Sequence, residues 1–163
     1  MKKIMILLVL VASVTMACAQ KSPREQASGT VNGINVAVDY GAPSVRDRVI
    51  WGELVPYAKV WRAGANENTT ITFDKDVTIA GQPLAAGKYG FFMIPNQSGD
   101  WTAIFSKKND AWGSNGYAES DDALRVSVAP KMVSDNQEQL KFSVGSSGID
   151  FAWEKARLQI PVK

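Results

Sequence analysis

Residues 34–40 read Ile-Asn-Val-Ala-Val-Asp-Tyr, and this stretch decides the fold class. Its apolar side chains recur at every second residue from Ile34 to Tyr40, so they share one face of an extended strand. The dipeptide Asn32-Gly33 directly before it suits the two positive-φ positions of a tight hairpin turn. The segment therefore predicts a β-strand with one buried face, entered through a hairpin.

The same two-residue period recurs along most of the remaining chain. Glycine, proline and asparagine cluster between the apolar runs, as expected for turns. No segment shows the spacing of a convincing amphipathic helix. About nine short strands predict an all-β fold, an antiparallel β-sandwich. Besides residues 34–40, the alternating or apolar runs lie at 69–73, 77–79, 88–94, 101–106, 124–128, 140–144, 149–153 and 157–162.

One domain accounts for residues 29–163, preceded by a polar N-terminal segment at 20–28. Residues 91–94 are apolar at every position, which is typical of a strand buried on both faces. With Trp101, Ile104 and Phe105 they are expected to form the core, and Trp153 to pack against them. Two long insertions interrupt the strand pattern, at 43–64 and 107–122. Because loops on a rigid scaffold carry recognition more often than strands do, we expect function there.

The first 19 residues are expected to be an export signal. A basic start precedes an apolar stretch at 4–14, which is too short to span a bilayer as a resident helix. Ala17-Cys18-Ala19 then fits the small-x-small rule for cleavage after Ala19. In the alternative, lipoprotein processing, Cys18 is acylated and becomes the first residue; the leucine expected three residues before it is absent. Either route predicts export to the periplasm or cell envelope, or an outer-membrane lipoprotein held through Cys18.

Composition excludes several classes of function. The 18 basic and 16 acidic residues become 16 of each once Lys2 and Lys3 leave with the signal. This balance argues against nucleic acid as a partner, and leaves membrane contact only through a lipidated Cys18. The chain has no histidine, and its one cysteine is Cys18. These absences exclude histidine-dependent triads, histidine or thiolate zinc sites, iron–sulfur ligation and internal disulfides. We expect no cofactor, no metal and no catalytic residue.

Several strings resemble a known family. They include Arg48-Val49-Ile50-Trp51-Gly52 and Val60-Trp61-Arg62-Ala63-Gly64-Ala65-Asn66, followed downstream by similarities at 86–95, 101–105, 112–117 and 124–130. Together they resemble the bacterial secreted family called domain of unknown function 2911, over about Gly29 to Val162. The resemblance implies an exported bacterial β-domain, and supplies no activity and no catalytic residue. Ala42 stands where the family's Tyr-Gly-Arg-Pro-like string has arginine, so a contact made by that arginine would be lost here.

The two insertions hold the candidate binding residues. Aromatic rings there could stack on an apolar ring face, such as that of a sugar, while Arg62 and Asn66 hydrogen-bond its polar rim. Arg62 is the strongest candidate because a planar guanidinium suits a carboxylate or phosphate. Trp112 and Tyr117 of the second insertion would complete one aromatic cleft. The candidate ligand-binding residues are Arg48, Trp51, Tyr57, Trp61, Arg62, Asn66, Trp112 and Tyr117.

A structural interpretation of the same residues stays open. Trp51 and Trp61 would plug the end of the sandwich, and Arg62 would pair with Glu53 or Glu67.

The acidic residues give little indication of hydrolysis or calcium binding. Asp74-Lys75-Asp76 is expected to be a hairpin turn rather than a hydrolytic carboxylate pair, and the carboxylates of residues 110–122 have no recognisable calcium spacing.

Three functions remain. The favoured one is a non-enzymatic envelope protein that binds a small molecule, a glycan or an envelope protein through the two insertions. The second is a structural or protein-interaction module without a small-molecule site. The third is an enzyme, such as a hydrolase, that uses only carboxylates, tyrosine or lysine. The sequence leans away from an enzyme, because it offers no general base beside the aromatic and arginine residues.

Overall fold

The computed structural model describes residues 21–163, and it confirms the all-β fold. Within these residues no helix is long and apolar enough to cross a membrane. The elements are β1 (Arg24–Val31), β2 (Ile34–Gly41), β3 (Thr69–Phe73), β4 (Val77–Ile79), β5 (Gln82–Leu84), β6 (Gly87–Ile94), β7 (Trp101–Ser106), the single 3-10 turn η1 (Glu119–Asp121), β8 (Asp122–Val128), β9 (Lys131–Gly145) and β10 (Gly148–Pro161).

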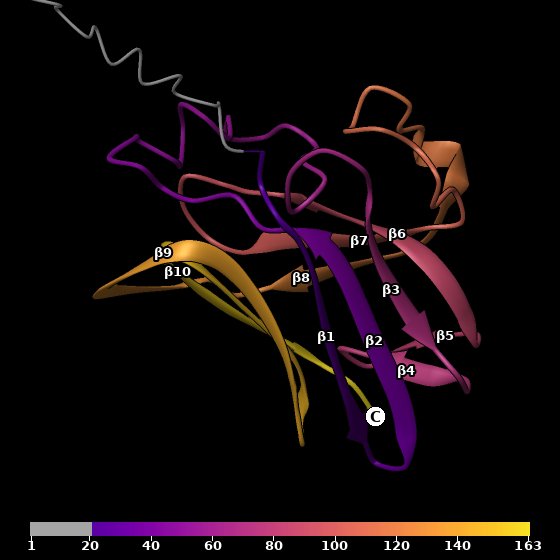
Figure 1. The fold of residues 1–163 in the computed structure, drawn as a ribbon. Helices are drawn as coiled ribbons and strands as arrows, with labels where there is room; N and C mark the ends of the chain where they lie inside the picture. Colours follow the sequence, from indigo (N-terminus) through magenta and orange to yellow (C-terminus); the bar gives the residue numbers. More distant parts are fainter. Residues whose placement is uncertain (1–20) are drawn as a thin grey trace, which may run out of the picture.

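Six strands form one antiparallel sheet in the order β1-β2-β3-β6-β7-β8 (Figure 1). The predicted hairpin joins β1 to β2 through Asn32 and Gly33, whose φ angles are 50° and 79°. On β2 every second side chain from Ile34 to Tyr40 is buried, so the alternation read from the sequence is confirmed. The inward face of this sheet forms one wall of the core.

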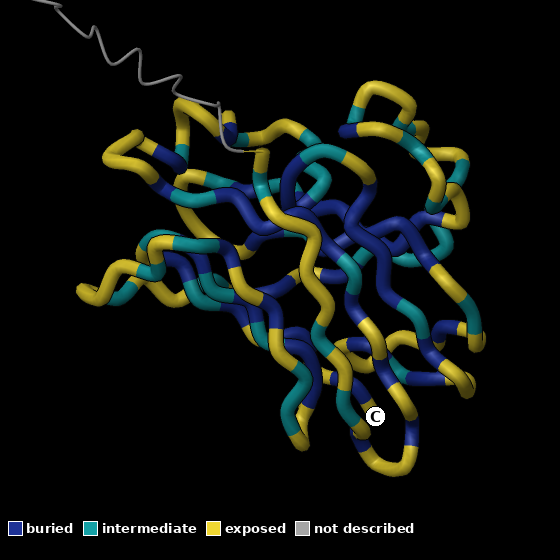
Figure 2. The backbone as a smooth tube through the Cα atoms, viewed as in Figure 1, coloured by how far each residue is buried: buried dark blue, intermediate teal, exposed yellow. Residues whose placement is uncertain are grey.

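The long hairpin of β9 and β10 forms the second layer and curves across that face (Figure 1). Phe142 of β9 lies edge-on to Tyr40 of β2, with ring centroids 4.9 Å apart, and also packs against Phe151 of β10. The small β4–β5 sheet closes one end through a bridge between Ile79 and Val162. Buried backbone lies where the layers face one another, and the connecting loops are exposed (Figure 2).

The expected core is confirmed. The runs at 91–94 and 101–105 lie on β6 and β7, and Trp153 of β10 is only 1% exposed. Ile94 is half-buried. Phe92 is buried away from the main core, because the second insertion places Tyr117 against it at 5.1 Å between ring centroids. Coverage of both faces explains why residues 91–94 of β6 are apolar at every position.

Several segments differ from the prediction, among them residues 131–139, which begin β9 although the expected strand starts at 140. Residues 24–28, expected in the polar N-terminal segment, are the first part of β1, an edge strand whose outward side chains are polar. Residues 149–153 and 157–162 belong largely to one strand, β10, which continues through a bulge where Glu154 has a φ of 50°. The extra strand β5 contains Pro83. The predicted signal, including Cys18 and Ala19, lies outside the described residues.

The segment Asp74-Lys75-Asp76 is not a hairpin turn, because β3 and β4 belong to different sheets. Asp74 accepts hydrogen bonds from the backbone N–H and the Nδ2 of Asn35, at 2.8 and 2.7 Å. Asp76 accepts one from the backbone N–H of Ala86 at 2.8 Å. Asp74 thus fastens the start of the β3–β4 connection to β2, and Asp76 fastens its end to the β5–β6 connection.

Candidate functional site

Four indoles gather where the first insertion meets the sandwich. Trp61 is fixed by backbone hydrogen bonds to Met93 of β6, with N–H and C=O both at 2.8 Å. Its ring stacks on Trp153 at 5.6 Å and 18° between planes. Trp51 lies edge-on to Trp61 at 5.7 Å and contacts Trp101 at 4.6 Å. The first insertion is therefore anchored by its tryptophans, as the structural interpretation expects.

Arg62 lies beside this cluster in a cavity of about 220 Å³, here called the Arg62 cavity. Leu54, Val55, Trp61 and Trp153 line it, together with polar residues that include Ser22 and Arg48. Arg62 is half-buried, and its Nε has no hydrogen-bond partner. Loss of water around the guanidinium lowers the pKa of Arg62 from its ordinary value.

The expected pairing of Arg62 with Glu53 or Glu67 is not present. Within residues 21–163, Arg62 makes no ion pair or side-chain hydrogen bond. Glu67 instead lies 3.8 Å from the ammonium of Lys21, and Glu53 is exposed. The Nε1 of Trp153, which also lines the cavity, is buried without an acceptor. Two residues that line the cavity thus each hold a buried N–H donor that has no partner in the described chain.

Both insertions lie at the same end of the sandwich (Figure 1). Arg62 of the first insertion lies close to Gly113 of the second. Gly113 of the second insertion lies so close that a Cβ atom there would be 3.7 Å from the Nη1 of Arg62. Gly113 is held by a hydrogen bond from its N–H to the carbonyl of Asn66 at 3.0 Å, with a φ of 65°. A bridge between Glu67 and Trp112 joins the same two segments.

Arg48 also lines the Arg62 cavity, but its guanidinium is engaged. Its Nε donates to the carbonyl of Val45 at 3.0 Å and its Nη2 to that of Ser44 at 2.6 Å. These bonds close the turn before Trp51. Arg48 therefore shapes the cavity, whereas Arg62 is the guanidinium left for a ligand.

Trp51 and Tyr57 line a different hollow, here called the Trp51 groove, of about 340 Å³. The β6–β7 turn, residues 96–100, and Trp101 also line it. Pro130 and Met132, before and at the start of β9, are further lining residues. This groove and the Arg62 cavity share no lining residue, and Trp51 of the groove meets Trp61 of the cavity edge-on.

The other three predicted residues lie apart from the indole cluster. The Nδ2 of Asn66 donates to the carbonyl of Ser22 at 3.4 Å. Trp112 is 59% exposed, with the ammonium of Lys21 5.6 Å from its ring centre. Tyr117 donates its hydroxyl to Asp122 at 2.7 Å and accepts a hydrogen bond from Arg125. The single aromatic cleft expected from the sequence is therefore divided, and Tyr117 fastens the second insertion to β8.

The Tyr117 network perturbs ionisation. Burial and the hydrogen bond to Asp122 raise the pKa of Tyr117 to about 12. The hydrogen bond to Asp122 raises the pKa of Arg125, which also lies 3.4 Å from Glu119. Within residues 21–163 no group of three or more carboxylate or cysteine side chains could hold a metal ion.

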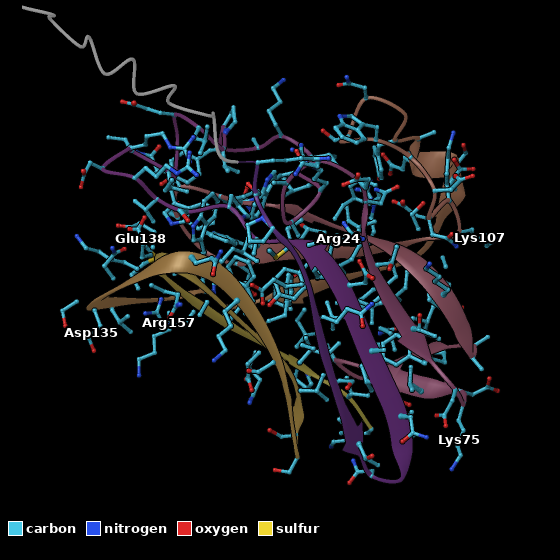
Figure 3. All side chains as sticks on the ribbon, in the orientation of Figure 1. Arg24, Lys75, Lys107, Asp135, Glu138 and Arg157 are labelled. Carbon is cyan, nitrogen blue, oxygen red and sulfur yellow. The ribbon has the colours of Figure 1, made fainter. Side chains whose placement is uncertain are left out.

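Sequence reasoning missed Arg24, which is labelled in Figure 3. Its guanidinium donates to the carbonyls of Glu67 and Asn68, at 3.3 and 2.8 Å, and forms an ion pair with Asp39. These contacts hold the N-terminal segment against the turn that follows Arg62, and place Ser22 in the wall of the Arg62 cavity. In the sequence, Arg24 appears only as one arginine in a polar segment. Such a segment has no hydropathy period from which a role for Arg24 could be predicted.

Comparison with known proteins gives one match. A family model described as a protein of unknown function (DUF2911) matches residues 22–162, nearly all of the described chain. No curated protein and no solved structure matches the chain.

Proposed function

The chain belongs to this family of unknown function, DUF2911, and from that premise we propose that it is a non-enzymatic binding module of the bacterial cell envelope. Its ligand is a small molecule with an anionic group, such as a carboxylate or a phosphate. The anion occupies the Arg62 cavity.

The observation that carries the proposal is a half-buried guanidinium without a partner. A charged group removed from water costs free energy unless it is paired or hydrogen-bonded. Arg62 has neither kind of partner within residues 21–163, and its pKa is lowered by that burial. A bound anion would accept hydrogen bonds from the Arg62 guanidinium.

The size of the cavity limits the ligand. Its 220 Å³ lie below the ~300–1,000 Å³ of drug-sized sites, so a single small anion or the acidic end of a larger molecule fits. Trp61 and Trp153 line part of the cavity, and the partial burial of Arg62 strengthens a charge-assisted hydrogen bond to its guanidinium. The absence of a carboxylate among the lining residues leaves the positive charge of Arg62 and Arg48 unopposed there.

Export is the second part of the proposal, and it rests on the apolar stretch at 4–14 and on Ala17-Cys18-Ala19. The intact mass of the protein recovered from bacterial cells tests it. A mass that begins at Gln20 supports cleavage after Ala19, and a mass that begins at Cys18 with two or three acyl chains supports the lipoprotein route. Retention of Met1 would overturn export.

Thermal unfolding and calorimetric titration test the anion site. Acetate, benzoate, phosphate and sulfate are titrated into the purified protein, with acetamide and benzamide as neutral matches. We expect at least one anion to bind saturably and to raise Tm, since a ligand at 100 Kd adds about 2.7 kcal/mol of stability.

The variant Arg62→Gln should weaken that anion at least tenfold. Lys59→Gln is the matched control, because it removes the same charge from an exposed side chain of the same insertion and should leave the affinity unchanged. Equal affinities in Arg62→Gln and the wild type, or no saturable binding of any anion, would overturn the proposal.

A further inference from the structure

We propose that the Trp51 groove is a second binding site, separate from the Arg62 cavity, and that it takes one uncharged pyranose ring of a sugar. The sugar can be free or can end a longer glycan, because the groove recognises a single ring. This site does not depend on the anion site.

The residues that line the groove fall into two chemical groups. One group, here called the aromatic wall, is apolar and aromatic; it includes Trp51 and Tyr57, both half-buried, and the side chain of Met132, which is 56% exposed. The other group is the polar turn Asn96-Gln97-Ser98-Gly99-Asp100. A pyranose has the same division, since its ring faces carry C–H groups and its rim carries hydroxyls. A groove that combines aromatic side chains with a polar segment matches such a ring.

The polar turn is rigid and keeps free hydrogen-bonding groups. Trp101 Nε1 donates to the carbonyl of Asn96 at 3.0 Å, and Asn96 Nδ2 donates to the carbonyl of Asp100 at 2.6 Å. Within residues 21–163, the side chains of Gln97 and Ser98 and the carboxylate of Asp100 have no partner. The turn therefore presents both donors and acceptors, which is what recognition of hydroxyl groups requires.

The aromatic wall is equally fixed. Trp51 is held by ring contacts with Trp61, Trp101 and Trp153. Tyr57 packs over Gly52 so closely that a Cβ atom there would lie 2.9 Å from the Tyr57 ring. Binding to such preorganised rings loses little side-chain entropy. The volume of about 340 Å³ lies at the lower end of the ~300–1,000 Å³ of small-molecule sites, in keeping with one ring.

Charge selects against acidic sugars. Among the residues that line the groove, Asp100 carries the one ionisable carboxylate and there is no lysine or arginine. An anionic ligand would be repelled there, whereas it is attracted to Arg62. The two sites should consequently bind different ligands.

Titration with methyl glycosides of glucose, galactose and N-acetylglucosamine, followed by tryptophan fluorescence and NMR, tests the site. We expect at least one to bind saturably, and glucuronate to bind more weakly than glucose. A linear oligosaccharide should bind within tenfold of the matching glycoside. A larger gain would overturn the single-ring assignment.

Variants locate the binding. Tyr57→Ala and Met132→Ala each remove part of the aromatic wall without touching the core, and each should weaken the sugar at least fivefold. Trp112→Ala, which removes an exposed tryptophan elsewhere, and Arg62→Gln should leave sugar affinity unchanged. The proposal is overturned if no glycoside binds, or if Tyr57→Ala and Met132→Ala both bind like the wild type. Thermal melts show that each variant is folded.

Discussion

The backbone N–H of Ala65 donates to the carbonyl oxygen of Gly41 at 3.2 Å, so the turn after Arg62 lies directly on the end of β2. A Cβ atom on Gly41 would collide with the carbonyl of Ala65, and one on Gly64 would lie 2.9 Å from the carbonyl of Gly41. The core strand and the candidate site are thus in backbone contact. The position of Arg62 depends on that close approach.

Replacement of Gly41 by alanine should therefore affect both stability and binding. We expect a loss of about 1–3 kcal/mol, because the added methyl group overpacks a site bounded by backbone. Anion affinity should fall at least tenfold, since the turn must move. Chemical denaturation and calorimetry measure the two effects.

Gly33→Ala is the control for that variant. Its Cβ would meet nothing within 4 Å, but its φ of 79° strains any side chain. It should lose about 1 kcal/mol of stability and keep its anion affinity. The same affinity in both alanine variants would show that the Gly41 contact does not position the site.

The sheet could be predicted from the sequence where alternation is strong. The runs at 69–73, 77–79 and 101–106 match β3, β4 and β7 at both ends, because apolar side chains recur within each run and turn residues bound it. The same dependence on alternating apolar side chains explains why the first part of β1 and the first part of β9 were missed. Their outward side chains are polar and their pairing uses backbone groups, which leave no hydropathy pattern.

The site was predictable in part. Trp61 and Arg62 stood out because rare residue types concentrate in one insertion. The roles of Trp101 and Trp153 in the indole cluster depend on β7 and β10 meeting that insertion, which is long-range information. The backbone φ angles of Ala63 and Asn66 are positive, 49° and 63°, and they set the course of the chain at Asn66 and its neighbours. Short sequence motifs do not specify such angles.

Tyr117 should make stability depend on alkaline pH. Its pKa is raised to about 12, from 10.0 for an ordinary tyrosine, so the folded protein retains the proton more tightly than the unfolded chain. The stabilising contribution of this group is complete below pH 10 and is lost as the pH rises through 12. Tyr117→Phe should therefore be less stable than the wild type near pH 8, by about 1 kcal/mol for the lost hydrogen bonds.

The difference between the two proteins should shrink between pH 10 and 12. Burial also raises the pKa values of Tyr40 and Tyr89, so both proteins lose stability in this range, and only their difference reports Tyr117. Urea denaturation at intervals from pH 8 to 11.5 measures it. A constant difference across that range would contradict the assignment.

Arg62→Met should make the ligand-free protein more stable, by about 1 kcal/mol. The substitution removes a buried donor that has no acceptor, and a thioether chain of similar length still fills the space beside Trp61.

Arg125→Met is the matched control. It removes a guanidinium whose Nε lies 2.5 Å from the Asp122 carboxylate, and should destabilise the protein because that carboxylate loses its cationic partner and keeps only the hydrogen bond from Tyr117. In the presence of a saturating anion, the wild type should become more stable than Arg62→Met, since only the wild type gains binding free energy. Urea denaturation with and without the anion measures both states, and an Arg62→Met protein less stable than the wild type in anion-free buffer would mean that the guanidinium is already satisfied without a ligand.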